Sequence, residues 1–187
     1  MRDHSTAIHE AGHAVIGRIL AIECGRVSID PDEECAGHCI IEGPWDIVQR
    51  WEGEGYVIRD NELVPTGTRP HGTYQSALRA RILTLMAGWA AELVILGDCR
   101  GGHGDDWYWI GRILEELPIP GQQEAGNGAW ERYEQRMRAK TISLVRRHRA
   151  KIEGLARALM SVGSLEPEEI EAILADIGPA APRIPDQ

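Results

Sequence analysis

The chain carries, near its start, the sequence Thr6-Ala7-Ile8-His9-Glu10-Ala11-Gly12-His13-Ala14-Val15. On a helix, residues four positions apart lie one above the other, so His9 and His13 are expected to direct ring nitrogens at the same ion. Zinc binds imidazole nitrogen, and a catalytic zinc site keeps one coordination position open for water. Glu10 is placed to reach that water rather than the metal and to take its proton. The stretch therefore predicts a zinc helix with His9 and His13 as ligands and Glu10 as general base.

A simpler interpretation is that His9 and His13 are ordinary polar residues at the start of an amphipathic helix. Gly12, which lies inside this helix, argues against it. A glycine in a helix interior costs about 1 kcal/mol relative to alanine, so its presence indicates that a side chain is not tolerated there. We therefore favour the metal site.

The length of 187 residues fits one domain with a substantial core. We expect this domain to cover residues 1–178 and a flexible, proline-rich tail to cover residues 179–187. The formal net charge of −9 argues against nucleic acid as a partner, since phosphate contacts come from surplus Lys and Arg.

No apolar run reaches the ~18 to 20 residues of a membrane span, and the polar N-terminus shows no signal peptide. A soluble, cytoplasmic protein is therefore expected. Its cysteines are expected to be reduced thiols rather than a disulfide framework. They are Cys24, Cys35, Cys39 and Cys99. A second metal site at Cys35, His38 and Cys39 is a less favoured alternative, because no matching second pair of ligands follows.

A small β-hairpin is expected beside the zinc helix. The helix itself is predicted over residues 5–23, with Ser5 as its N-cap and Gly25 as its stop. Residues 26–30 alternate in hydropathy like a strand, and residues 38–41 form the returning strand.

The region between residues 42 and 72 is rich in glycine and proline, with interspersed aromatic residues. A loop this long inside a compact domain is usually functional or mobile. Two interpretations stay open. The loop is either a flap over the metal or a surface excursion pinned by its aromatic side chains.

Further helices make the expected fold mainly α. They are predicted over residues 73–96 as a buried spine, from the glycine-rich turn 101–107 to about residue 117, over 129–161 as one long helix or a helix pair, and over 167–178. The cations of Arg146–Arg149 are interpreted as a solvated face that alternates with glutamates of the same helix.

Two histidines do not complete a catalytic zinc site, so a third protein ligand must come from elsewhere in the chain. The local extension His-x-x-Gly-x-x-His is excluded, because Ile16 and Ile19 occupy the positions of that glycine and histidine. The candidates at a distance are Glu92 in the spine helix and His103, Asp105 and Asp106 in the glycine-rich turn. Residue type and spacing leave the choice among them open.

Three stretches carry a resemblance to a known family. They read Ile8-His9-Glu10-Ala11-Gly12-His13-Ala14, Met86-Ala87-Gly88-Trp89-Ala90-Ala91-Glu92-Leu93 and Gly102-His103-Gly104-Asp105-Asp106. The family is the peptidase domain of the FtsH-type AAA proteases, metallopeptidase family 41. In the same order, the three stretches are similar to its zinc helix, its Gly-Gly-Arg-Ala-Ala-Glu-Glu helix and its Thr-Gly-Ala-x-Asn-Asp turn. The helices over residues 152–170 are similar as well, so the resemblance covers nearly the whole chain.

In that family the last aspartate of the turn is the third zinc ligand, which implies Asp106 in this chain. The resemblance also implies an FtsH-peptidase-like helical array with a small β-hairpin next to the zinc helix, one zinc per chain and a homo-oligomer. The family's ATPase module has no counterpart, because the sequence contains no Gly-x-x-x-x-Gly-Lys-Ser/Thr loop. Trp89 replaces the family arginine and His103 replaces a small residue, which bears on oligomer contacts and substrate choice.

Together these features predict a soluble zinc endopeptidase that hydrolyses flexible polypeptide without an ATPase of its own. Glu10 is the expected general base, and His103 is a second catalytic candidate, as a stabiliser of the oxyanion. One alternative is a zinc-containing binding or regulatory module that docks on a partner such as a separate ATPase. Another is a regulatory protein that contacts nucleic acid through Arg146–Arg149, against which the acidity of the chain weighs.

Overall fold

The computed structural model describes residues 2–31, 37–43, 46–47, 56–59, 62–65, 74–99, 104–117, 119 and 127–176. Along the chain the elements are α1 (His4–Ile19), β1 (Cys24–Ser28), β2 (His38–Ile41), β3 (Tyr56–Arg59), β4 (Glu62–Pro65), α3 (Tyr74–Leu85), α4 (Ala87–Ile95), α5 (Gly104–Glu116), α7 (Asn127–Val162), β5 (Ser164–Leu165) and α8 (Pro167–Asp176). Helices dominate, which confirms the predicted mainly α class. The predicted tail lies outside the described residues, and the single domain over residues 1–178 stays a prediction.

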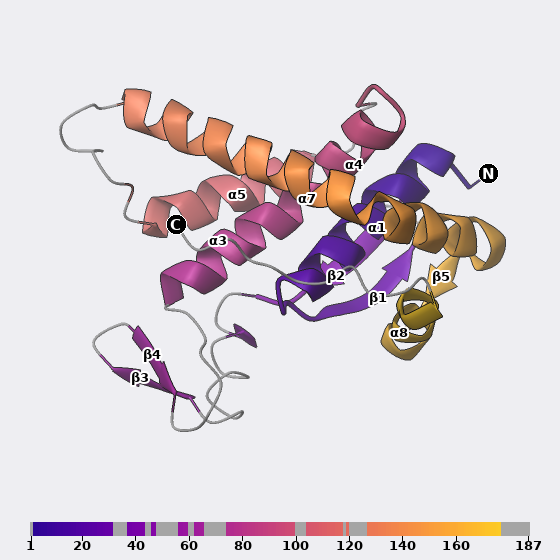
Figure 1. Ribbon diagram of the computed structural model, residues 1–187, viewed down its shortest axis with the longest axis horizontal. Helices are drawn as coiled ribbons and strands as arrows, with labels where there is room; N and C mark the ends of the chain where they lie inside the picture. The colour runs from indigo at the N-terminus through magenta and orange to yellow at the C-terminus, as the bar shows by residue number, and fades with distance from the viewer. Residues whose placement is uncertain are drawn as a thin grey trace.

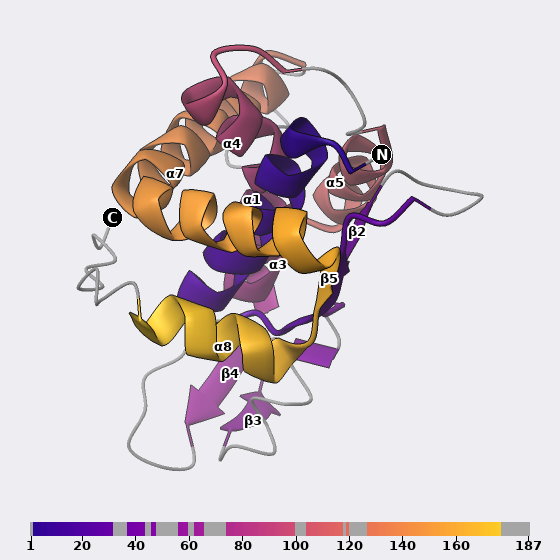
Figure 2. The same cartoon turned by 90° about the vertical axis from the view of Figure 1, so that its right-hand side faces the viewer.

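Helix α1 is the central element of the fold. Helices α3, α4 and α7 and strands β1 and β2 all pack against it, and Figures 1 and 2 show the long α7 crossing it. Its apolar side chains, among them Ile8, Val15 and Ile16, are almost completely buried. The histidine pair therefore lies on a core helix, where packing on several sides fixes the direction of each side chain.

Both predicted ends of α1 need correction. The N-cap is Asp3 rather than Ser5, whose hydroxyl instead donates a hydrogen bond to the Asp3 carboxylate. The helix ends at Ile19, well before Gly25, which belongs to β1. The backbone closes there in a Schellman pattern, with N–H of Ile22 bonded to the Gly17 carbonyl and Ala21 at a φ of 59°. Glycine usually occupies that left-handed position, so the alanine gave no signal in the sequence.

The predicted hairpin is part of a larger sheet. Strand β1 pairs antiparallel with β2, in a register that joins Val27 to Cys39, and also antiparallel with β5, where Val27 faces Leu165. The sheet order is β2-β1-β5, so β1 is the central strand. The third strand contains only two residues, which is too short for any alternation of hydropathy to reveal.

Residues 42–72 contain a hairpin that was expected to be part of a loop. Strands β3 and β4 pair antiparallel, from Tyr56 opposite Pro65 to Arg59 opposite Glu62. Much of the rest of this region lies outside the described residues, so its predicted role as a flap or a surface excursion stays untested.

The predicted spine over residues 73–96 consists of two helices rather than one. The turn at Met86 separates α3 from α4, although N–H of Met86 still bonds to the Ile82 carbonyl and N–H of Ala90 to the Met86 carbonyl. Met86 itself keeps helical dihedral angles, so the helical hydrogen bonding continues across the junction of α3 and α4. Small residues of α4 then approach α1 closely.

Helix α7 confirms the predicted long helix of the C-terminal half. A break from helical geometry at His148, with φ −108° and ψ 16°, divides it into two segments. His148 is buried, and this burial together with the charges of Arg147 and Lys151 lowers its pKa. Within the predicted basic face, Arg149 donates to Glu153 one turn later at 2.7 Å, as expected for a solvated face with its own glutamates.

No helix in the described part of the chain is both long and apolar enough to span a bilayer.

Gly12 is required where α1 and α4 meet. A Cβ atom at this position would lie 2.7 Å from the Ala87 carbonyl oxygen and 2.8 Å from Cβ of Ala91. Gly12→Ala is expected to lower the free energy of unfolding of the metal-free protein by about 1 to 2 kcal/mol, because overpacking costs about 1–3 kcal/mol and alanine returns about 1 kcal/mol of helix propensity. Chemical denaturation measures this difference.

Gly111 of α5 provides the matched control, since a Cβ atom there would meet no other atom within 4 Å. Gly111→Ala is expected to raise stability by roughly 0.5 to 1 kcal/mol through helix propensity alone. Equal stabilisation by both substitutions would contradict the close approach of α1 and α4.

Candidate metal centre

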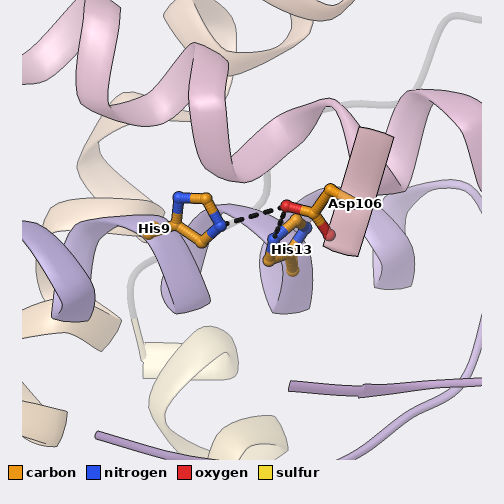
Figure 3. Close-up of side chains that lie close together, drawn as sticks. All are labelled: His9, His13 and Asp106. Atoms are coloured by element: carbon orange, nitrogen blue, oxygen red, sulfur yellow. Dashed lines mark hydrogen bonds and ion pairs between the residues drawn. The ribbon is translucent and has the colours of Figure 1, made fainter. Parts of the chain in front are cut away.

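Three side chains from two distant elements converge at the middle of α1. Nε2 of His9 and Nε2 of His13 each lie 3.2 Å from Oδ2 of Asp106, which is in the first turn of α5. The donor atoms of the three residues all lie within 4.8 Å of one another (Figure 3). The structure thus brings together His9, His13 and Asp106, the set that the sequence analysis reached through the family resemblance.

Helix geometry explains how α1 supplies two of the donors. His9 and His13 are one turn apart, and their rings stand edge to face with centroids 4.7 Å apart. The side chains of His9 and His13 are 9% and 4% exposed, whereas the Asp106 side chain is 17% exposed. The cluster is therefore enclosed on the side of α1 and more open on the side of α5.

The outer nitrogen of each imidazole is held by a buried acceptor. Nδ1–H of His9 donates to Oε1 of Glu92 at 2.7 Å, and Nδ1–H of His13 donates to the carbonyl oxygen of Thr84 at 2.8 Å. Such bonds orient metal-binding histidines and leave Nε2 as the coordinating nitrogen. Both rings are therefore arranged to present Nε2 toward Asp106.

The other candidates for the third ligand have different places. Glu92 contacts the outer nitrogen of His9, so it supports the ring instead of adding a donor on the Nε2 side. Asp105 is exposed on α5 and does not belong to the three-residue group. His103 lies outside the described residues, so its predicted role at the oxyanion stays a prediction.

Gly88 explains how α4 can lie close to the coordinating nitrogens of both imidazoles. A Cβ atom at position 88 would lie 2.5 Å from Nε2 of both His9 and His13. Any side chain there would displace the rings, so the position requires glycine. Neither Gly88 nor the Thr84 carbonyl was predicted to belong to the site. For Gly88 the sequence does contain a signal, because a glycine inside an apolar helix often marks a close packing contact.

The two histidines and Asp106 shift one another's pKa values in opposite directions. Burial alone would lower the pKa of His9, but hydrogen bonds to Asp106 and Glu92, together with the charges of Glu10 and Asp106, raise it to about 10. Burial likewise opposes protonation of His13, and Asp106 outweighs it, so the pKa of His13 is raised. Burial would raise the pKa of Asp106, but the two histidines lower it. The carboxylate of Asp106 thus favours a positive charge on the two imidazoles, as it would favour a cation bound between them.

Glu10 is buried beside this cluster without being one of its three donors. Burial raises the pKa of its carboxyl group, against the opposing charges of His13 and His9. Gly37, just before β2, packs close by, because a Cβ atom there would lie 3.4 Å from Cγ of Glu10. The start of β2 therefore covers the side chain of the predicted base.

The donor chemistry of the cluster fits zinc. Two imidazole nitrogens and one carboxylate oxygen are a known ligand set of catalytic zinc sites, which leave the fourth position to water or substrate. The second hydrogen bonds of both histidines complete the usual outer support of such a site.

Comparisons with known proteins point in the same direction. No known family model matches the chain. The chain is 28% identical to the ATP-dependent zinc metalloprotease FtsH 3 of Sorangium cellulosum, over 90% of its own length and 28% of the relative's. It is 26% identical to the ATP-dependent zinc metalloprotease FtsH 2 of Sphaerobacter thermophilus, over 90% of its own length and 26% of the relative's. Nearly the whole chain is thus similar to about a quarter of an FtsH-type zinc metalloprotease.

Proposed function

We propose that this protein is a zinc-dependent endopeptidase that hydrolyses peptide bonds in flexible polypeptides. The observation that carries the proposal is the convergence of His9, His13 and Asp106, with Glu10 buried beside them. The similarity to FtsH-type zinc metalloproteases supports it independently.

In this proposal, Nε2 of His9, Nε2 of His13 and a carboxylate oxygen of Asp106 hold the ion. When bound, zinc supplies Lewis acidity, which polarises the scissile carbonyl group and lowers the pKa of water. Glu92 and the Thr84 carbonyl keep the imidazoles in the orientation that binding needs.

Glu10 then moves the proton that hydrolysis requires. Its carboxylate accepts a proton from the water that attacks the carbonyl carbon, and passes that proton to the leaving amine nitrogen as the C–N bond breaks. Such a role typically contributes about 10² to 10⁴-fold in rate. The side chain is buried next to both histidines, within reach of the region that the three donors enclose.

The proposed substrates are polypeptide segments that need no unfolding before they are cleaved. These 187 residues contain no Gly-x-x-x-x-Gly-Lys-Ser/Thr loop, so they provide no means of unfolding a folded protein with ATP. Unfolded or flexible segments are therefore the proposed substrates. Cleavage of folded proteins would require an ATPase outside these 187 residues, and a separate ATPase partner and assembly into a homo-oligomer both stay proposals.

Removal and return of zinc tests the proposal. The zinc-loaded protein is expected to cleave casein, an unfolded protein, in the absence of nucleotide. Treatment with a chelator is expected to reduce cleavage below detection, and zinc is expected to restore it, because the ligand set favours zinc over magnesium or calcium. Gel electrophoresis of timed samples measures the products.

Magnesium or calcium added to the chelated protein serves as the control and should restore nothing. Undiminished cleavage after complete removal of zinc would overturn the proposal. A protein that binds zinc and cleaves no unfolded substrate would instead favour the binding-module alternative.

A further inference from the structure

The placement of Asp106 depends on what holds the first turn of α5. Asp106 is the third residue of that helix, after Gly104 and Asp105. The first turn of a helix has unpaired backbone N–H groups and is the least fixed by the helix itself. Tertiary contacts of this turn therefore determine how well the carboxylate is held against the histidines.

The main packing of α5 lies further along the helix. Its buried residues Ile110, Ile113 and Leu114 join a core cluster with residues of α3. In the first turn the packing residue is Trp107, directly after Asp106. Its ring meets the ring of Trp89 on α4, with centroids 6.4 Å apart and planes at 66°. Trp107 thus supplies an aromatic contact to α4 directly beside the candidate ligand in the chain.

Arg138 of α7 joins these two rings. Its guanidinium carbon lies 4.4 Å from the centroid of Trp107 and 4.7 Å from that of Trp89. Glu134, one turn earlier on α7, accepts hydrogen bonds from Nε of Arg138 at 3.0 Å and from Nη2 at 2.8 Å. The guanidinium group is therefore held in place by Glu134, and it contacts one aromatic ring on α4 and one on α5.

We propose that Arg138 is a positioning residue for the zinc site: by contacting Trp107 and Trp89 together, it fixes the first turn of α5, and hence Asp106, against α4. Trp89 directly follows Gly88, which lies close to Nε2 of both His9 and His13. The contacts of Arg138 with Trp89 and Trp107 thus connect the helix that borders the imidazoles with the helix that carries the carboxylate. This inference rests on the proposed zinc site, since it concerns how well that site is assembled.

A simpler interpretation is that Arg138 forms an ordinary surface pair with Glu134. The two side chains are 36% and 38% exposed, and pairs of that kind contribute little to stability. A surface pair would leave zinc binding unchanged when Arg138 is replaced. The two interpretations therefore differ in one measurable quantity, the affinity for zinc.

The experiment measures zinc affinity by competition with a chelator in full-length variants. Arg138→Met, which removes the cation and the planar group, is expected to weaken zinc binding about tenfold, in the range found for residues that support metal ligands. Arg138→Lys keeps the cation and is expected to recover part of that loss. Arg136→Met is the matched control, because Arg136 lies over Tyr133 of its own helix, and its affinity should equal that of the wild type.

Two further readouts exclude a merely structural effect. The visible spectrum of the cobalt-substituted protein, which reports ligand geometry, is expected to change in Arg138→Met and to stay unchanged in Arg136→Met. In a Trp107→Leu background, Arg138→Met is expected to have almost no additional effect on zinc affinity, because the two residues act through one contact.

Zinc affinity of Arg138→Met within twofold of the wild type would overturn the inference, as would full additivity with Trp107→Leu. Cleavage is scored separately in the same proteins. A wild type that binds zinc but does not cleave would remove the proposed activity and leave the positioning role intact. If the wild type binds zinc and cleaves, and replacement of Arg138 leaves zinc affinity unchanged, the proposed activity stands and the positioning role is removed.

Discussion

Glu10→Gln is expected to lower kcat for peptide cleavage by about 10² to 10⁴-fold while the protein still binds one zinc per chain. Glutamine has nearly the same volume as glutamate, so the buried space beside α1 stays filled. The amide cannot accept a proton from water. The three donor atoms are untouched by the substitution, because Glu10 is not one of them.

Steady-state cleavage of an unfolded substrate, with zinc content measured on the same samples, tests this expectation. Glu131→Gln, which removes an exposed carboxylate on α7, is the control for the change in net charge and should cleave like the wild type. Two results would count against the role of Glu10 as base. One is a variant that keeps more than a tenth of the wild-type kcat, and the other is a variant that loses activity only because it loses zinc.

The parts of the site that could be predicted from sequence are the local ones. His9 and His13 are four residues apart on a helix, so their convergence follows from helix geometry alone. Gly12 indicated a close packing contact, and the contact is with α4. Strands β1 and β2 were predicted as neighbours, because a short turn between alternating segments favours a hairpin.

The third donor could not be derived in the same way. Asp106 reaches α1 only through the tertiary packing of α5, which residue types and spacing do not encode. Four candidates therefore stayed open, and only the family resemblance implied Asp106. Glu92 was a candidate ligand by residue type, with a buried, paired carboxylate as the other interpretation. The structure has the latter, because its buried carboxylate accepts the hydrogen bond that holds His9.

The errors in secondary structure have similar causes. The end of α1 depends on a left-handed alanine, Ala21, where propensity would place glycine. The two-residue strand β5 is defined by its pairing with the second edge of β1, and this pairing joins residues that are far apart in the sequence. In these two cases tertiary packing overrides a local preference. The division of the predicted spine at Met86 has no signal in the sequence, because residues on both sides favour a helix.

The strongest test of the metal centre compares three carboxylates that were all candidates for the third ligand. Asp106→Ala removes the oxygen that lies 3.2 Å from Nε2 of both histidines. It is expected to weaken zinc binding by more than about 100-fold, since even residues that only support a ligand cost 10–100-fold. Cleavage should be lost with the metal.

Asp105→Ala is the closest control that the chain offers. Asp105 and Asp106 both lie in the first turn of α5, so each substitution removes a negative charge near the same helix N-terminus. Only Asp106 faces the histidines, and zinc affinity in Asp105→Ala is expected to stay within about twofold of the wild type. The loss of zinc affinity in Glu92→Gln should lie between those of the other two variants, at about 10 to 100-fold. This substitution weakens the support of one ligand and removes none.

Chelator competition under identical buffer conditions gives all three affinities. The expected order of loss is Asp106 first, Glu92 second and Asp105 last, and this order distinguishes a ligand from a supporting acceptor and from a surface charge. A larger loss in Glu92→Gln than in Asp106→Ala would mean that the bound ion draws Glu92 into its first coordination sphere. Asp106 would then be a hydrogen-bond partner of the two imidazoles rather than the carboxylate ligand of the ion.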